Sequence, residues 1–403
     1  MLVKVLLALT VIMITARVMG ALFARVNQPA VIGEVVGGIL LGPSLLGRLS
    51  PEAAAFLLPP DAAPFLSVIA QLGVILYMFL VGLELDLSLL TTKVSTTVVI
   101  ALTSIVVPFA LGGLLAVFLA DSIAPPGVPF SSFVLFLGVS MSITAFPVLA
   151  RILGDRGLQR TEMGTLALTC AAINDAIAWC LLAFVVGVMQ DTPAEAAWTV
   201  GLTFLYIALM LTLGRAIVTA AVARLESSTR IGERSLALVL VAVLLSAVAT
   251  EFIGIHAIFG AFLLGAVIPH HSQVALQVTD RLADLVRVMF LPAFFAYTGL
   301  RTEIGLVHTV EDWLLCVVII AVATAGKFGG TTLAAKMMGL RWRDSSALGI
   351  LMNTRGLVEL IVLNIGLDLG VITPRLFTML VIMALVTTMM TSPALTALTR
   401  REK

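Results

Sequence analysis

Charged side chains are scarce in this sequence: Asp, Glu, Lys and Arg together make up 12% of its 403 residues. Soluble domains carry roughly 25% charged residues, whereas 60% of this chain is hydrophobic. This composition excludes a soluble globular protein and indicates a polytopic protein embedded in a lipid bilayer. The formal net charge is only +1, which gives no indication of a nucleic-acid partner.

Cysteine and the motifs of enzyme chemistry are also rare. Cys170, Cys180 and Cys316 lie inside apolar segments, with neither CxxC nor metal-ligand spacing, so we expect no disulfide framework. We find no phosphate-binding loop, nucleophile triad or zinc spacing, and therefore expect neither an enzyme nor a bound cofactor. The length leaves no room for a soluble nucleotide-binding domain, which favours transport driven by an ion gradient.

Long apolar segments are abundant. Runs of about twenty apolar residues, bounded by charged residues or by Pro and Gly, indicate membrane-spanning helices. Thirteen are predicted, near residues 2–23, 29–47, 64–84, 92–120, 130–155, 161–190, 196–223, 233–252, 255–271, 284–301, 311–338, 343–367 and 373–398. We expect a single all-α transmembrane domain over 1–403 without a soluble regulatory domain.

The basic residues between the spans predict the orientation. One set of alternate connections holds nearly all of them, whereas the other set holds only Lys4, Arg48, Arg301 and Arg375. By the positive-inside rule, the N-terminus is expected outside and the C-terminus in the cytoplasm, as a multi-pass protein of the cell inner (plasma) membrane.

The two halves of the chain resemble each other weakly. AVIGEVVGGILLGPS (30–44) is similar to AIFGAFLLGAVIP (257–269), and FLVGLELD (79–86) is similar to AYTGLRTE (296–303). We expect one repeat over about 1–190, a linker helix over about 196–223 and a second repeat over about 233–398. Because the linker is one extra span, the second repeat enters from the opposite face, as in the inverted repeats of secondary transporters.

Two spans carry matching interruptions. The fifth contains Thr144 followed by Pro147, and the twelfth contains Asn353-Thr-Arg-Gly356. Polar residues combined with Pro or Gly in corresponding spans predict discontinuous helices near the membrane midplane, where a binding site is formed. The alternative is a tolerated kink in an ordinary helix.

Asp175 is the leading candidate for the transport site. It follows Asn174 near the centre of the sixth span, where a carboxylate costs several kcal/mol unless it has a partner. A carboxyl group that takes either a proton or a metal cation, but never both, couples two opposite fluxes. Asn174 adds an amide oxygen that suits a hard cation. The alternatives are a capped core aspartate and an asparagine that serves helix packing.

Other polar residues in the spans are candidates for charge balance. Lys327 lies deep in the eleventh span, and Arg355 and Glu359 are spaced to pair on one helix face. All three are candidates for balancing charge. For Arg355 and Glu359 we predict a gating or scaffold role, and for Lys327 the alternative is a fixed structural ion pair. Glu84 and Asp86, at the predicted cytoplasmic end of the third span, either attract cations into a funnel or simply solvate that end.

Seven motifs in order are similar to one transporter family. VIGEVVGGILLGPSLLG, FLVGLELD, SITAFPVLARIL, AAINDAIAW, GIHAIFGAFLLG, AGKFGG and MNTRGLVELIVLNIG together resemble the monovalent cation:proton antiporter-2 family, which includes Kef-type systems and the plant cation/H+ exchangers. The resemblance implies an NhaA-like antiporter fold with two crossing discontinuous helices, and a homodimer with a dimer domain beside a mobile core domain.

The resemblance also implies roles for individual residues. Asp175 is then the ion- and proton-binding carboxylate, with Asn174, Thr144 and Asn353 as supporting groups and Lys327 as the buried lysine. Electrogenic members carry Asp-Asp where this chain has Asn-Asp, so we expect electroneutral exchange, although the retained lysine weakens that argument.

The resulting prediction is a secondary active antiporter that exchanges Na+ or K+ for H+ by alternating access. Three alternatives stay open: a cation channel or uniporter, a non-transporting membrane receptor subunit with a transporter-like fold, and a sodium-coupled organic-anion carrier.

Overall fold

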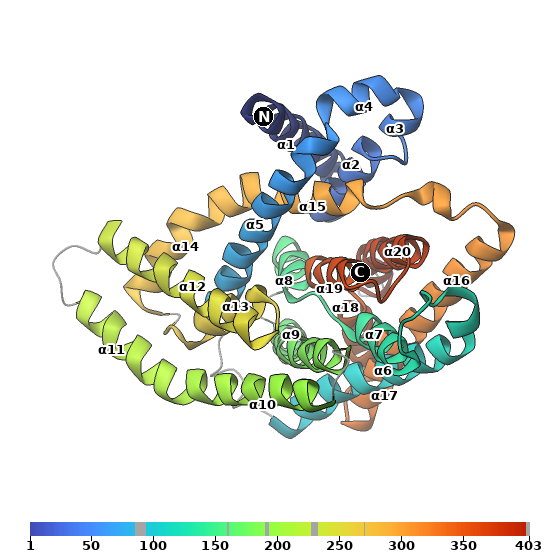
Figure 1. The fold of residues 1–403 in the computed structure, drawn as a ribbon. Coiled ribbons are helices and arrows are strands. Elements are labelled where there is room, and N and C mark those ends of the chain that lie inside the picture. The colour runs from blue at the N-terminus through green and yellow to red at the C-terminus, as the bar shows by residue number, and fades with distance from the viewer. Residues whose placement is uncertain (85–93, 159–160, 190–192, 227–232, 270, 400–403) are drawn as a thin grey trace. The chain divides into compact units, whose positions relative to one another are not determined.

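A computed structural model of the chain describes residues 1–84, 94–158, 161–189, 193–226, 233–269 and 271–399. Every regular element within these ranges is a helix and none is a strand (Figure 1), which confirms the all-helical class. The described residues divide into two compact units, each assembled from separate parts of the chain. The described residues within 1–9, 60–89 and 183–294 belong to the first unit, and those within 10–59, 90–182 and 295–403 belong to the second.

The apolar segments predicted from the sequence are helical. In the described part of the chain, 10 stretches are long and apolar enough to cross a membrane, and two shorter apolar helices accompany them. The count of thirteen spans stays a prediction, because the fifth and twelfth predicted spans are each split into two short helices. The helical stretch of the tenth span begins at Gln273, earlier than the predicted residue 284, because polar and charged residues within 273–285 interrupt the apolar pattern.

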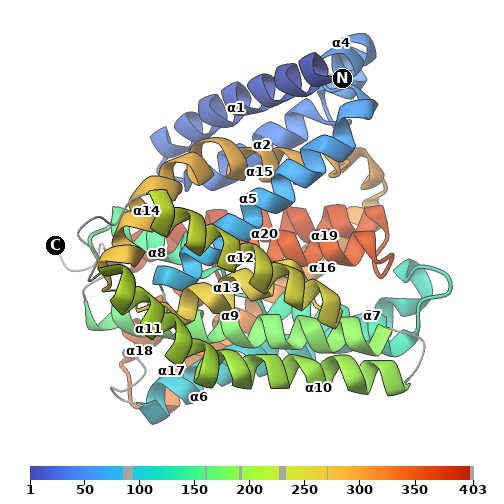
Figure 2. The ribbon, with the colours of Figure 1, turned by 60° about the vertical axis from the view of Figure 1, so that its left-hand side comes forward.

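Within the first unit, α5 (Ala63–Glu84), α12 (Glu233–Ile253) and α13 (Ala257–Val267) pack side by side (Figure 2). The helices α5 and α13 approach closely because glycines meet: a Cβ on Gly265 would lie 3.0 Å from the Cα of Gly82. Small residues allow such contacts between membrane helices. The unit also contains η1 (Pro60–Ala62), α10 (Pro193–Leu209), η3 (Met210–Gly214), α11 (Arg215–Glu226), α14 (Gln273–Leu285) and η4 (Val286–Phe290).

The second unit carries the interrupted helices. Its elements are α2 (Ala30–Leu41), α3 (Leu46–Leu49), α4 (Pro51–Leu57), α6 (Val94–Ile123), α7 (Phe130–Ser142), α8 (Phe146–Asp155), η5 (Ile304–Leu306), α16 (Val310–Thr324), η6 (Ala325–Gly329), α17 (Gly330–Met337), α18 (Trp342–Met352), α19 (Leu357–Asp368) and α20 (Pro374–Thr399). Three further helices contribute residues to both units: α1 (Leu2–Arg25), α9 (Glu162–Met189) and α15 (Leu291–Leu300).

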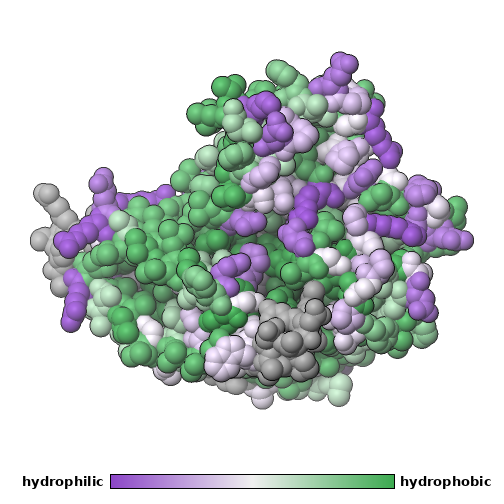
Figure 3. All heavy atoms as spheres, in the orientation of Figure 1, coloured by the Kyte–Doolittle hydropathy of each residue, from purple (hydrophilic) through white to green (hydrophobic). Residues whose placement is uncertain are grey.

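Large hydrophobic side chains cover much of the molecular surface. Figure 3 shows broad hydrophobic areas on the visible face, and exposed residues such as Phe118, Trp198 and Phe252 are at least 69% accessible. Such surface is unfavourable in water but is expected of helices that face lipid tails. The surface chemistry therefore agrees with the composition in placing this chain in a membrane.

The two predicted interruptions are present in the second unit. The helix stops after Ser142 and resumes at Phe146, and it stops again after Met352 and resumes at Leu357. The non-helical stretches meet, because the Ala145 N–H donates a hydrogen bond of 3.0 Å to the Thr354 carbonyl. The chain thus forms two crossing discontinuous helices.

Local sequence explains why each helix resumes where it does. Proline is favoured in the first turn of a helix, where its missing N–H costs nothing, and Pro147 occupies that place in α8. Before α19, Gly356 packs against α8 so closely that a Cβ there would lie 2.6 Å from Val148 Cγ2. A side chain at this position would have to displace Val148, so glycine allows the close approach.

Candidate functional site

Three residues predicted to act in transport meet at the crossing. Asn174 lies near the middle of α9, Thr144 lies between α7 and α8, and Lys327 lies in the π-helical turn η6. All three are fully buried. Lys327 Nζ donates a hydrogen bond of 2.6 Å to Thr144 Oγ1, and the Asn174 side-chain amide lies 3.1 Å from the same hydroxyl. The Thr144 hydroxyl, in the first interruption, therefore contacts both the Asn174 amide of α9 and the Lys327 ammonium of η6.

The Asn174 amide has one orientation that satisfies both of its ends. Its oxygen then accepts from Lys327 Nζ at 3.2 Å and from Ser104 Oγ at 3.0 Å, while its nitrogen donates to the Ala101 carbonyl at 3.1 Å. In the reverse orientation the amide NH₂ group faces the ammonium, and two donors repel each other. We therefore assign the carbonyl end of Asn174 to Lys327.

Asp175 stands apart from this network. The residue is 1% exposed, and neither carboxylate oxygen has a hydrogen-bond partner among the described residues. The N–H of Phe146, at the start of α8, and the charge of Lys327 both interact favourably with its ionised form. An ionised carboxylate without hydrogen bonds is costly in such a place. The group is therefore stable either as the neutral acid or with a cation beside it.

A second buried oxygen is unsatisfied at the other interruption. Asn353 follows the last residue of α18 and is 5% exposed. Its Oδ1 has no hydrogen-bond partner among the residues that the structure describes. Unpaired buried oxygens are rare in folded proteins and call for an explanation. A role in holding a cation is one explanation for both this amide and Asp175.

Arg355 stabilises the end of α7. Its Nη1 donates to the Ser140 carbonyl at 2.9 Å and its Nη2 donates to the Met141 carbonyl at 2.8 Å. These carbonyls lie in the last turn of α7, where the interruption removes the helical N–H groups that would otherwise bond them. The helix C-terminus also carries partial negative charge, so the guanidinium stabilises it twice, by hydrogen bonds and by charge.

Thr144 performs the corresponding task for α18. Its hydroxyl donates to the carbonyl of Met352, the last residue of that helix, at 3.0 Å. Each interruption thus supplies a side chain that caps the helix ending at the other interruption. This reciprocal capping explains how two unwound stretches are stable inside an apolar protein, where unpaired backbone groups are expensive.

Glu359 compensates the charge of Arg355. It lies in the first turn of α19 and forms an ion pair of 3.1 Å with Arg355 Nη1, and both side chains are fully buried. A carboxylate in the first turn also interacts favourably with the helix dipole. Because Arg355 is fixed by two backbone carbonyls and one carboxylate, the pair is a rigid part of the crossing.

Close packing against α6 positions Lys327. A Cβ on the preceding residue, Gly326, would lie 2.8 Å from the Cα of Pro108 on α6. The same helix presents Ser104 to the Asn174 amide. The helix α6 therefore supports both the amide and the ammonium of the network.

The two funnel candidates are not placed at this site. Glu84 is the last residue of α5 and forms an exposed ion pair of 3.6 Å with Arg287 of η4, within the first unit. Asp86 lies outside the described residues. Their proposed role in attracting cations stays a prediction.

Sequence reasoning missed two hydroxyl groups of the site. Ser104 contacts the Asn174 amide from α6. Thr388 of α20 accepts from the Arg355 N–H at 3.0 Å and donates to the Arg355 carbonyl at 2.8 Å. Serine and threonine are common in membrane helices, so no local sequence signal distinguishes these two from the others.

Comparisons with known proteins point to one class. The family model described as "Sodium/hydrogen exchanger, transmembrane" matches residues 11–401. The chain is 45% identical over 380 residues to the Na+/H+ antiporter NhaS4 of Synechocystis sp., and the match covers 94% of this chain and 93% of that protein.

Eukaryotic relatives and a solved structure extend the likeness. The chain is 39% identical over 393 residues to cation/H+ antiporter 17 of Arabidopsis thaliana and 35% identical over 380 residues to K+/H+ antiporter 1 of Saccharomyces cerevisiae. It spans 48% and 43% of the length of these two relatives. The sodium proton antiporter MjNhaP1 from Methanocaldococcus jannaschii shares the fold, with a TM-score of 0.69 at 14% identity, over 98% of this chain and 96% of that chain.

Proposed function

This chain belongs to the sodium/hydrogen exchanger family, and from that premise we propose that it is a secondary active antiporter. It exchanges a monovalent cation, Na+ or K+, for H+ by alternating access. The named relatives, a Na+/H+ antiporter and a K+/H+ antiporter, support this reaction and leave the choice of cation open.

The observation that carries the proposal is the state of Asp175. Its two carboxylate oxygens are buried and unpartnered among the described residues, next to a crossing of interrupted helices. A proton neutralises this group, and a dehydrated cation does the same, but one carboxylate does not hold both. Binding of one ion therefore releases the other, and occupancy alone couples the two opposite fluxes.

The neighbouring groups support this exchange. The amide oxygen of Asn174 and the hydroxyl of Thr144 are hard oxygen donors of the kind that bind Na+ and K+, and Asn353 offers an unsatisfied amide oxygen. Lys327 is held by Thr144, where its charge balances Asp175 once the proton has left. Arg355 and Glu359 are bonded to each other and to α7, so they act as scaffold and take no part in the exchange of ions.

The position of Asn174 supports electroneutral exchange, one proton for one cation. A single exchanged carboxyl group carries one charge in each direction, so no net charge crosses the membrane. The membrane potential, which contributes about 2.3 kcal/mol per charge per 100 mV, therefore does not affect such a cycle. We further propose a homodimer in the plasma membrane, with the N-terminus outside and the C-terminus in the cytoplasm.

Transport in proteoliposomes tests the proposal. Purified protein is reconstituted with a pH-sensitive dye inside, and Na+, K+ or Li+ is added outside with and without a valinomycin clamp. Wild-type protein should move protons on addition of cation, and the clamp should leave the rate unchanged. Asp175→Asn should abolish this movement while keeping a monodisperse gel-filtration profile. Asp312→Asn, which alters another buried carboxylate of the second unit, should retain exchange. Full exchange by Asp175→Asn would refute the assignment.

The same assay separates the alternative functions. A channel or uniporter would give cation conductance without proton countertransport. A receptor subunit with a transporter-like fold would give neither conductance nor proton movement with any of the three cations.

A further inference from the structure

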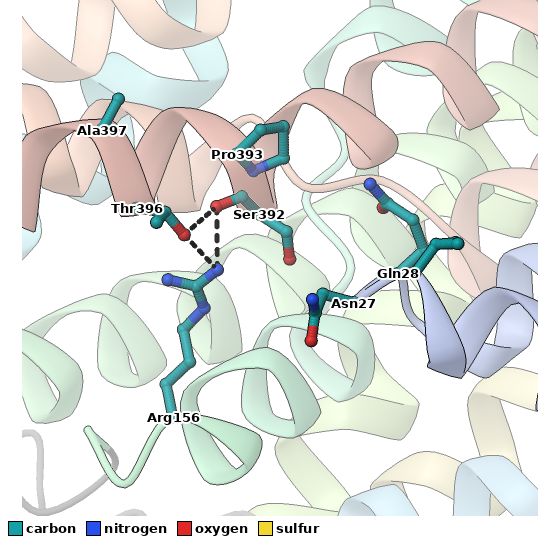
Figure 4. Close-up of a pocket in the computed structure, with 8 residues that line it drawn as sticks. Asn27, Gln28, Arg156, Ser392, Pro393, Thr396 and Ala397 are labelled. Carbon is teal, nitrogen blue, oxygen red and sulfur yellow. Dashed lines mark hydrogen bonds between the residues drawn. The ribbon is translucent and has the colours of Figure 1, made fainter. Parts of the chain in front are cut away.

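A polar pocket lies away from the ion site in the second unit. Its volume is about 320 Å³, and it forms where the α1–α2 connection, the end of α8 and the C-terminal half of α20 meet (Figure 4). Its polar lining consists of Asn27, Gln28, Arg156, Ser392 and Thr396. None of these residues belongs to the network around Asp175, so the pocket requires a separate explanation.

A proline on α20 determines one wall of the pocket. Because Pro393 lacks an N–H, the carbonyl of Met389 four residues earlier loses its helical donor. Gln28 Nε2 replaces that donor with a hydrogen bond of 3.2 Å to the Met389 carbonyl. The bond fixes the α1–α2 connection against α20 and holds the pocket open between them.

Arg156 is only partly used by the protein. Its Nη2 donates to the Ser392 carbonyl at 2.8 Å and to Thr396 Oγ1 at 2.9 Å (Figure 4). Its Nε and Nη1 have no hydrogen-bond partner in the described part of the chain, and no described carboxylate pairs with it. Partial burial lowers the pKa of Arg156, because desolvation disfavours the cation. The guanidinium thus keeps two nitrogens unused by described protein acceptors and has no described carboxylate beside it.

Asn27 adds a further donor at the opposite side of the lining. The residue adopts a left-handed conformation with φ 57°, which asparagine tolerates better than most residues. Its side-chain amide has no hydrogen-bond partner among the described residues. The pocket thus combines guanidinium N–H groups and an amide that no described protein acceptor occupies.

We propose that this pocket binds a phosphate group, carried either by a lipid headgroup or by a small soluble phosphate. A guanidinium group donates charge-assisted hydrogen bonds to phosphate oxygens, and the Asn27 amide is available for a further oxygen. The pocket is larger than a lone carboxylate requires, and the charge of Arg156 repels the transported cations. It lies at the end of the spans that carries the basic connections, where anionic headgroups concentrate.

Binding by the purified full-length chain tests this inference independently of transport. Thermal unfolding and native mass spectrometry are recorded with three probes: phosphatidylglycerol, a diacylglycerol with the same acyl chains, and inorganic phosphate against chloride. If only phosphatidylglycerol raises the Tm, the phosphate group comes from a lipid headgroup. If inorganic phosphate raises the Tm, it comes from a soluble phosphate. Arg156→Gln should weaken the apparent Kd by about tenfold or more, as expected for loss of a charge-assisted hydrogen bond.

A matched control is an arginine of α18 that also bonds to α20. Arg343 donates from Nε and Nη2 to the Leu398 carbonyl of α20 at 3.1 Å and 2.8 Å, outside the pocket, so Arg343→Gln should bind like wild type. Asn27→Ala leaves the contacts of α20 intact and should weaken binding several-fold. The Asn27→Ala variant therefore tests the inference if Arg156→Gln fails to fold. The inference is overturned if no phosphate probe binds wild-type protein, or if the folded pocket variants bind as wild type does.

Discussion

Replacing Arg355 with methionine should destabilise the crossing more than replacing any exposed arginine. Methionine keeps most of the side-chain length and removes the guanidinium. The change removes the donors to the Ser140 and Met141 carbonyls and leaves Glu359 without its ion-pair partner. Because both side chains of the pair are fully buried, water does not replace the lost contacts.

The size of the effect follows from these three contacts. Breaking a buried ion pair by removing one partner costs about 3–5 kcal/mol, although protonation of Glu359 relieves part of that cost. Each carbonyl that loses its donor adds about 0.6–1.7 kcal/mol on the scale measured for membrane helices. We therefore expect Arg355→Met to lower the free energy of unfolding by at least about 3 kcal/mol. Adding Glu359→Gln should recover about half of the loss, because the stranded carboxylate is removed.

Unfolding by SDS in mixed micelles, followed by tryptophan fluorescence, measures these free energies. Arg375→Met is the control, because Arg375 is 41% exposed and also pairs with a buried carboxylate, that of Asp312. Asp312 keeps its hydrogen bonds from the backbone N–H groups of His308 and Thr309, so the control should lose only about 1–2 kcal/mol. A loss below about 1 kcal/mol in Arg355→Met, or no recovery in the double variant, would contradict the capping role.

Two further predictions concern the crossing and the stoichiometry. Gly356→Ala should destabilise the protein by about 1–3 kcal/mol, as overpacking does, because its Cβ would lie 2.6 Å from Val148 Cγ2. Adding Val148→Ala should restore much of the stability in the same unfolding assay. If Gly356→Ala leaves the free energy of unfolding unchanged, the helices at the crossing are not closely packed. Asn174→Asp places a second carboxylate 3–4 Å from Lys327, on the order of the present amide contact, and should make exchange sensitive to the valinomycin clamp. Exchange that stays insensitive to membrane potential would show that this position does not set the stoichiometry.

The positions of the helices were largely predictable from the sequence. Runs of apolar residues determined where α5 and α6 begin and end, and where the stretch from α16 to α17 does, because a helix is the simplest structure that satisfies its backbone in lipid. The interruptions were predictable as well, since Pro147 and Gly356 act on the backbone locally. The start of α14 was not, because its polar, amphipathic sequence resembles a connection.

The partners of the polar residues could not be predicted from the sequence. Nothing near Arg355 in the chain indicates that its guanidinium bonds to carbonyls more than 200 residues away, with sequence separations of 215 and 214. The same holds for Ser104, which is an ordinary helix serine until α6 packs beside α9. Asp175 is informative in both respects: its place in an apolar span marked it as a candidate, but only the fold leaves its oxygens unpaired.

The sequence by itself determined that this chain forms membrane helices, where two of them break, and which carboxyl group lies deep among them. These properties depend on local chemistry: the length of apolar runs, the missing N–H of proline and the absence of a side chain in glycine. Only the tertiary structure decided which interruption caps which helix, which side chains surround Asn174, and where Arg156 faces an open pocket. Those outcomes depend on contacts between distant segments, and a contact exists only once the helices have packed.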